Sequence, residues 1–224
     1  MSDKRGGRGA KTVRETSAAM RSRRPQAERS AETQGKLIEA AIACLHSVGY
    51  SQTTVGMVAD AAGVSRGALT HQYPSKVDLM LAVVRSVSEA NVDQYSRLLD
   101  GKTPMEAVLF IPQALWRVTR GPATMAVIEI ILASRSDAVL TEKLRLMQAD
   151  LEATAKQLLV ARFMAAGLEP PANADAVFSL FVAAARGLAI ESIASGRNEL
   201  VDEVVELLTK IFAMLLPDAA GEGV

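Results

Sequence analysis

The side chains best suited to a specific recognition chemistry lie close together, between residues 54 and 76. Arg66 carries a guanidinium group that can donate two hydrogen bonds to guanine O6 and N7, or can hold a phosphate. Gly67 and Ala68 are small enough to let a backbone approach a partner closely. Thr70 can contact a thymine methyl group or a phosphate. These residue types at this spacing favour DNA binding over catalysis.

Two short helices joined by a glycine turn would position these side chains. Thr54 is a good N-cap for a first helix, and Gly63 falls where that helix should end, because glycine enters the left-handed conformation without steric cost. Ser65 can cap a second helix, which Pro74 stops. Such a pair forms a helix-turn-helix, which can lay its second helix in the major groove of DNA. An ordinary helical hairpin without a DNA partner is the alternative.

Residues 49–76, GYSQTTVGMVADAAGVSRGALTHQYPSK, resemble the signature of the tetracycline-repressor (TetR/AcrR) family of bacterial transcriptional regulators. The resemblance runs from about Leu37 to Leu79 in a three-helix order. It departs at Thr70, where the family usually has tyrosine, and at Gln72, where histidine is frequent. These departures affect the operator sequence rather than the fold, and beyond residue 80 only the all-helical layout is similar.

The resemblance implies a dimeric regulator, usually a repressor, that a small-molecule effector releases from a near-palindromic operator. It implies that the helix from Lys76 to about Leu99 transmits the ligand signal, and that His71 and Lys76 position the protein on the DNA backbone. Thr54 adds a backbone N–H at a helix start, a place that attracts phosphate. The predicted DNA-binding residues are Thr54, Arg66, Gly67, Ala68, Thr70, His71, Gln72 and Lys76.

Residues 1–30 hold nine Lys or Arg against three acidic side chains, although the chain as a whole carries no net charge. This stretch lacks an apolar periodicity and is rich in Gly, Ser and Arg, which predicts a disordered arm. The arm can add phosphate contacts and a strong salt dependence. A solvated extension without a role in binding is the alternative. No apolar run is expected to span a bilayer, and a cytoplasmic protein that does not bind membranes follows.

Residues 76–218 are predicted to form a helical effector-binding and dimerisation domain. Glu129 interrupts the apolar run VIEIILA, so it must find a partner, orient a ligand or reach solvent. Large apolar side chains at helical spacing can line a cavity or simply form core. The candidate ligand-binding residues are Trp116, Met125, Glu129, Met147, Phe178 and Phe181.

The last two helices, over residues 175–216, predict a homodimer. The run AVFSLFVAAARGLAI is apolar nearly all the way round, so a helix built from it must be covered on two sides. Two such helices per chain suit a four-helix bundle across a two-fold axis. The alternative is the internal core of a monomer.

Side chains suited to catalysis or metal binding are few. His46 and His71 fall on different predicted helices, and Cys44 is the single cysteine, so neither a zinc set nor a disulfide is available. No nucleophile-elbow motif accompanies His71, so no serine nucleophile is predicted to use it as a base. The sequence therefore predicts no enzyme activity, no metal and no cofactor.

The sequence predicts an all-α protein with an arm (1–30), a helix-turn-helix domain (31–75) and a second helical domain (76–218). A regulator without a small-molecule ligand, and a helical dimerisation protein that does not bind DNA, remain alternatives.

Overall fold

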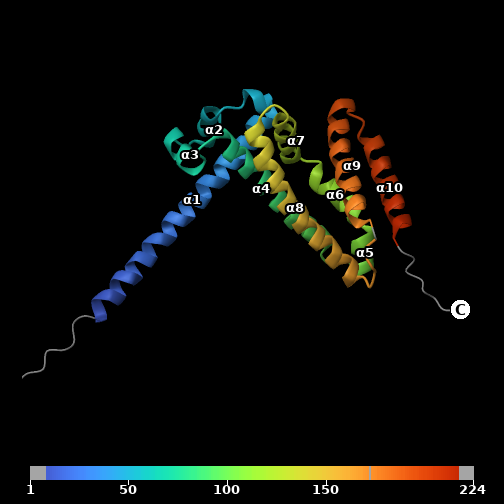
Figure 1. Ribbon diagram of the computed structural model, residues 1–224, viewed down its shortest axis with the longest axis horizontal. Coiled ribbons are helices and arrows are strands. Elements are labelled where there is room, and N and C mark those ends of the chain that lie inside the picture. Colours follow the sequence, from blue (N-terminus) through green and yellow to red (C-terminus); the bar gives the residue numbers. More distant parts are fainter. Residues whose placement is uncertain (1–8, 172, 217–224) are drawn as a thin grey trace, which may run out of the picture.

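The computed structural model describes residues 9–171 and 173–216, with side chains from residue 27 onward. All regular structure in that part of the chain is helical, which confirms the all-α prediction (Figure 1). The helices are α1 (Gly9–Gln52), α2 (Val55–Ala62), α3 (Arg66–Gln72), α4 (Lys76–Leu99), α5 (Pro104–Leu109), α6 (Ile111–Thr119), α7 (Pro122–Ser134), α8 (Ala138–Ala165), α9 (Ala174–Ser195) and α10 (Asn198–Leu215).

Local capping chemistry sets the boundaries of α2 and α3. The Thr54 side chain accepts a hydrogen bond from the Met57 N–H, and the Ser65 side chain accepts one from the Ala68 N–H. Gly63 ends α2 in the left-handed conformation, with φ of 66°. The two helices and the glycine turn therefore form as the sequence predicts.

The first helix begins much earlier than predicted. Backbone geometry is helical from Gly9, so the prediction of a disordered arm over residues 1–30 does not hold for residues 9–30, and residues 1–8 lie outside the described part. Ala and Arg are frequent in this segment and are strong helix formers, and extending an existing helix avoids the cost of nucleation. Near its other end α1 is interrupted at Gly49, which is non-helical with φ of 72°.

The second domain is built around α4, which contacts α6, α7 and α8. Ser75 caps α4 by accepting from the Asp78 N–H, and Lys143 of α8 forms an ion pair with Asp78 at 2.8 Å. Pro112 lies in the first turn of α6, and the chain breaks just before it, since α5 ends at Leu109 and α6 starts at Ile111. The core that runs from α1 into α4 and α7 joins this domain to the first three helices.

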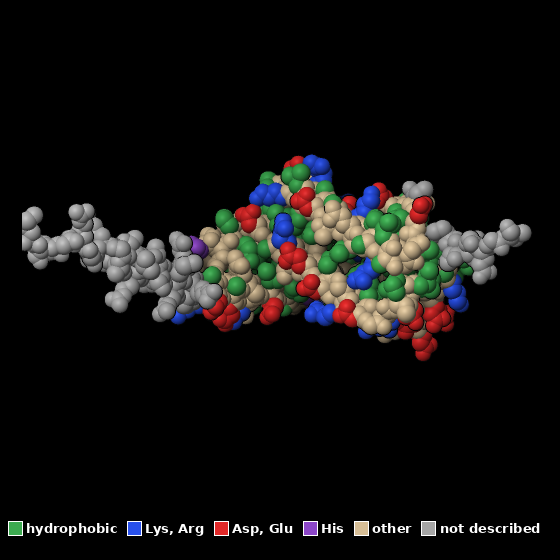
Figure 2. Space-filling view, turned by 90° about the horizontal axis from the view of Figure 1, so that it is seen from below, with side chains coloured by type: hydrophobic (Ala, Val, Ile, Leu, Met, Phe, Trp, Pro, Cys, Tyr) green, Lys and Arg blue, Asp and Glu red, His purple; other side chains and the backbone are tan. Residues whose placement is uncertain are grey.

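Helices α9 and α10 pack on each other at the end of the molecule opposite α2 and α3 (Figure 1). Phe181 of α9 and Phe212 of α10 meet edge to face at 5.2 Å between ring centroids. The outer faces of the two helices keep large apolar side chains in contact with solvent, and space-filling atoms show apolar groups at this end of the molecule (Figure 2). The exposed set is Leu180, Ile190, Ile193, Leu200, Leu207, Ile211, Met214 and Leu215.

Helix α9 is also long and apolar enough to cross a membrane by length and composition, contrary to the expectation from the sequence. That criterion is weak evidence by itself, because helices that pack in soluble proteins meet it too. Here α9 packs against α6, α7 and α10 and carries Arg186 on its length. These contacts favour a packing helix.

Candidate functional site

One face of helix α3 packs against the core of the protein, and the opposite face is exposed to solvent. Leu69 is fully buried and Tyr73 nearly so, and both pack into the main core. The opposite face is exposed and brings together the predicted residues Arg66, Gly67, Ala68, Thr70 and His71. A helix held in this way can enter a groove without disturbing its own packing.

Arg66 lies back over the start of α2. Its Nη2 is 4.0 Å from Asp60 Oδ2, and a methyl group added at Gly56 would lie 3.1 Å from the same nitrogen. Because both side chains of the pair are about three-quarters exposed, this ion pair contributes little stability and leaves Arg66 able to turn to a DNA partner. Gly56 was missed by sequence reasoning, although a glycine inside a helix pattern signals close approach.

Gln72 and Lys76, both predicted to contact DNA, are engaged within the protein. Gln72 donates to Ser30 Oγ at 2.8 Å and accepts from Gln34 Nε2 at 3.0 Å, which ties α3 to α1. Lys76 Nζ donates to the Tyr50 carbonyl at 2.6 Å and lies 4.0 Å from the centroid of the Tyr50 ring. Burial lowers the pKa of Lys76. Both side chains thus position the helix-turn-helix.

Glu129 also contacts Tyr50, and it does not belong to a ligand site. Its Oε2 accepts a hydrogen bond from the Tyr50 N–H at 3.1 Å, so α7 holds the end of α1. The prediction that Glu129 orients a ligand is therefore wrong, and the alternative of a partnered acid holds. Glu129 of α7 thus binds the Tyr50 N–H, and Lys76 of α4 binds the Tyr50 C=O. We call these contacts of Tyr50, Lys76 and Glu129 the Tyr50 corner.

Removing the Glu129 carboxylate is expected to weaken this corner. In Glu129→Ala the partly buried Tyr50 N–H loses its acceptor, which should lower the free energy of unfolding by about 1–3 kcal/mol. Glu129→Gln is the matched control, because its side-chain carbonyl can still accept the bond. Urea denaturation of both variants measures the difference, and equal stabilities would contradict a structural role for this bond.

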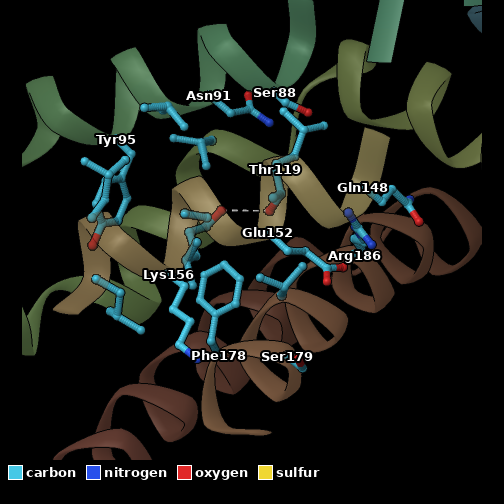
Figure 3. Close-up of a pocket in the computed structure, with 18 of the residues that line it drawn as sticks. Ser88, Asn91, Tyr95, Thr119, Gln148, Glu152, Lys156, Phe178, Ser179 and Arg186 are labelled. Atoms are coloured by element: carbon cyan, nitrogen blue, oxygen red, sulfur yellow. Dashed lines mark hydrogen bonds between the residues drawn. The ribbon is translucent and has the colours of Figure 1, made fainter. Parts of the chain in front are cut away.

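A cavity of about 640 Å³ lies between α4, α6, α8 and α9 (Figure 3). Helices α8 and α9 make little contact with each other, since α8 packs on α4, α5 and α7 while α9 packs on α6, α7 and α10. The space between them therefore stays open. Its walls are mainly apolar and include Val87, Leu115 and Phe178.

Phe178 is the one predicted ligand-binding residue that lines this cavity. Trp116 and Met125 pack against Ala189, Val201 and Val205, so they form core beneath α9 and α10. Met147 packs against the main core, and Phe181 meets Phe212 edge to face. These assignments to a ligand site are corrected, because large apolar residues at helical spacing more often fill a core than line a cavity.

Sequence reasoning missed the polar side chains of the cavity. Figure 3 shows Gln148, Glu152 and Arg186 grouped at one end, with Tyr95 at the other. Burial raises the pKa of Tyr95 to about 12, opposed by the charge of Arg162, so the phenol is neutral at pH 7. Burial lowers the pKa of Arg186, and the negative charge of Glu152 opposes this shift. The available signal was polar residues recurring on otherwise apolar faces of α4 and α9.

Two helices contribute opposite charges across the open side of the cavity. Lys156 of α8 forms an ion pair with Asp175 of α9 at 2.7 Å. Arg186 remains without an ion-pair partner among the described residues. The cavity thus joins a large apolar volume to a few polar groups, the composition typical of small-molecule sites. In the same described ranges, no three His, Cys, Asp or Glu side chains gather as a metal site would require.

Comparison with known proteins finds a family match for the helix-turn-helix region. Residues 37–83 match the description "Bacterial regulatory proteins, tetR family". The HTH-type transcriptional regulator CymR of Pseudomonas putida is 42% identical over 87 residues, which are 39% of this chain and 43% of CymR. An uncharacterized HTH-type transcriptional regulator of Mycobacterium tuberculosis is 30% identical over 126 residues, 54% of this chain and 63% of the relative. The aligned region thus spans less than two thirds of these relatives.

Solved structures share the fold over most of the chain. Salmonella enterica GusR superposes with a TM-score of 0.65 at 24% identity, over 82% of this chain and 95% of its own. A TetR transcription regulator from Haloarcula marismortui gives 0.65 at 16%, over 84% and 100%. A SmeT–triclosan complex gives 0.60 at 21%, over 84% and 93%. The curated relatives are named as regulators and not as enzymes. Residues 37–83 of the chain thus match the tetR family of bacterial regulatory proteins, and the solved structures share the fold of most of the chain.

Proposed function

We propose that this protein is a cytoplasmic, homodimeric transcriptional regulator that represses from a near-palindromic operator until a small amphipathic molecule binds. The observation that carries the proposal is α3, which buries Leu69 and turns Arg66, Thr70 and His71 outward on one face. That face has the donors and the small residues that major-groove recognition needs. Among the described residues, no other surface has a comparable case for binding DNA.

The exposed apolar faces of α9 and α10 support the dimer. Patches of this kind on a soluble protein mark interaction surfaces, and this one lies away from the helix-turn-helix. Pairing with a second copy would form a four-helix bundle about a two-fold axis. The two α3 helices could then read half-sites about 34–36 Å apart, one turn of DNA.

The cavity supports a small-molecule effector over a regulator without a ligand. Its volume of about 640 Å³ falls in the range of drug-sized sites, and a structure of similar fold is a complex with triclosan. Helix α4 reaches from Lys76 at the Tyr50 corner to Ser88, Asn91 and Tyr95 in the cavity wall. An effector that binds more tightly to one placement of α4 would shift the spacing of the two α3 helices.

Selection of genomic fragments with the purified protein tests the proposal. Enrichment of one near-palindromic sequence, followed by its release when a cavity ligand is added, is the expected result. Weak binding without sequence preference, even at low salt, would favour a helical dimerisation protein. Specific binding that no compound in a broad screen can release would favour a regulator without a small-molecule ligand.

The basic segment before residue 27 is expected to add phosphate contacts. It holds eight Lys or Arg, and its removal leaves the contacts of Ser30 and Gln34 with Gln72 intact. Each lost phosphate contact should reduce the slope of log affinity against log salt by about 0.9. Fluorescence anisotropy across a salt series, with full-length protein and a deletion of residues 1–26, measures the slope. Equal slopes would make the segment a solvated extension.

A further inference from the structure

A second hollow, of about 470 Å³, opens beside the start of α7. It lies between α4, the end of α6 and the first turn of α7, and we call it the α7 groove. Its charged lining residues are Arg117 and Arg120, both positive, and no acidic residue lines it. Glu89 and Asp93 of the neighbouring α4 are outside its lining.

The first turn of α7 offers one unpaired backbone donor to this groove, the Ala123 N–H. Its N-cap is Gly121, so no side chain caps the helix, and Pro122 has no N–H. The Thr124 N–H donates to the Gly121 carbonyl at 3.1 Å, whereas the Ala123 N–H makes no such bond to the described backbone. The positive end of the helix dipole lies at the same place and favours an anion.

Thr124 is the independent sign of a ligand. The residue is only 5% exposed, yet its hydroxyl donates to and accepts from no described protein group. Thr119 differs, because its hydroxyl donates to the Leu115 carbonyl at 2.8 Å. Among the described residues no side-chain N or O atom is both sealed from solvent and unpaired, so the unpaired Thr124 hydroxyl reaches open space. That space is the α7 groove or the effector cavity, since Thr124 lines both. Its hydroxyl is therefore available to a molecule bound there.

The two arginines of the groove are also free of ion pairs within the described ranges. Neither Arg117 nor Arg120 has a carboxylate within ion-pair distance in the described ranges. The Arg117 guanidinium lies 5.1 Å from the centroid of the Phe110 ring. Stacking on a ring face orients the guanidinium plane and leaves its N–H edge free for an oxyanion.

We propose that the α7 groove binds an anionic group, a carboxylate or a phosphate. The Arg117 and Arg120 guanidinium groups, the Ala123 N–H and the Thr124 hydroxyl supply the donors. Val87, Asn91, Val118 and Thr124 line both this groove and the apolar cavity, so the anion can be the head group of an effector whose body fills the cavity. It can also be a free small anion. The first source rests on the proposed function, and the second does not.

Two dyes with one skeleton separate charge from apolar contact. 1-Anilinonaphthalene-8-sulfonate carries an oxyanion, and N-phenyl-1-naphthylamine lacks it. For Arg117→Gln with Arg120→Gln, we expect about tenfold weaker binding of the sulfonate and less than about twofold change for the neutral dye, since charge-assisted hydrogen bonds are the strong ones. Thr124→Val should weaken only the sulfonate. Arg97→Gln with Arg135→Gln, which removes the same charge outside the groove, is the control and should change neither.

Inorganic phosphate distinguishes the two sources. If phosphate displaces the sulfonate dye and raises the Tm of the wild type and the control, but not of the groove variant, the ligand is a free anion. If phosphate has no effect while the sulfonate still depends on the arginines, the groove takes a head group. Equal sulfonate affinities in the groove and control variants would overturn the proposal. Operator binding by the wild type is measured in parallel, so failure of the regulator proposal shows there and not in the dye titrations.

Discussion

Replacing Leu207 with glutamate is expected to convert the protein to a monomer and to lower operator affinity by about 100-fold or more. Leu207 is 55% exposed in the single chain and lies among the exposed apolar residues of α9 and α10. A carboxylate there would be buried without a partner in the bundle of two copies, which is costly. A monomer holds only one half-site, and loss of the second site typically removes a factor of about 100–10,000.

Val139→Glu is the matched control for Leu207→Glu. Val139 is 59% exposed on α8, outside the α9–α10 face. This variant should stay dimeric and keep its operator affinity. Sedimentation velocity measures the mass, and anisotropy measures DNA binding. A Leu207→Glu protein that remained a dimer would move the interface elsewhere, and a monomer with unchanged operator affinity would remove the need for a dimer.

Truncating Arg66 is the second large expected effect. A bidentate contact to guanine is worth about 1–3 kcal/mol, roughly 5- to 150-fold, and a dimer makes it twice. Arg66→Ala should therefore weaken operator binding by about 30-fold or more. The free energy of unfolding of Arg66→Ala should change little. The Arg66 side chain is 75% exposed, and its contact with Asp60 is at the 4.0 Å limit for an ion pair.

Arg66→Lys separates base readout from phosphate binding. Lysine keeps the positive charge but not the planar fork. If Arg66 reads guanine, Arg66→Lys should lose most of the specific affinity and keep the salt dependence of the wild type. If Arg66 holds a phosphate instead, Arg66→Lys should bind nearly as well as the wild type, while Arg66→Ala should lower the salt slope by about 0.9 per subunit. Competition between operator and random duplex measures both.

The helix-turn-helix could be predicted because its determinants are local. Thr54, Gly63 and Ser65 act on backbone groups within three or four residues of themselves, so the sequence alone places them. Ser75 caps α4 in the same way. The exposed face of α3 follows once Leu69 is assigned to the core. Assignments that depend on one helix and its ends therefore hold.

The effector cavity could not be predicted because it depends on contacts that are remote in sequence. Whether Trp116 fills a core or lines a cavity is decided by Ala189 of α9 and by Val201 and Val205 of α10, all more than seventy residues away. Glu129 finds its partner at Tyr50, which is 79 residues distant. Lys76 was assigned to DNA from the family pattern, yet its ammonium reaches the Tyr50 carbonyl. Residue type gave the range of partners, and only the fold selected among them.

The Tyr50 corner sets a rule for domain grafting. A hybrid protein that joined residues 31–75 of this chain to the second domain of a relative would keep Tyr50 but would discard both Lys76 and Glu129. The grafted corner would then need a lysine and an acid from the new domain at matching places, or its peptide groups would lose both partners. A junction placed after residue 76 keeps the contact between Lys76 and the Tyr50 carbonyl. The helix that contributes residue 129 must be chosen for an acceptor at that position before the hybrid can inherit a working connection.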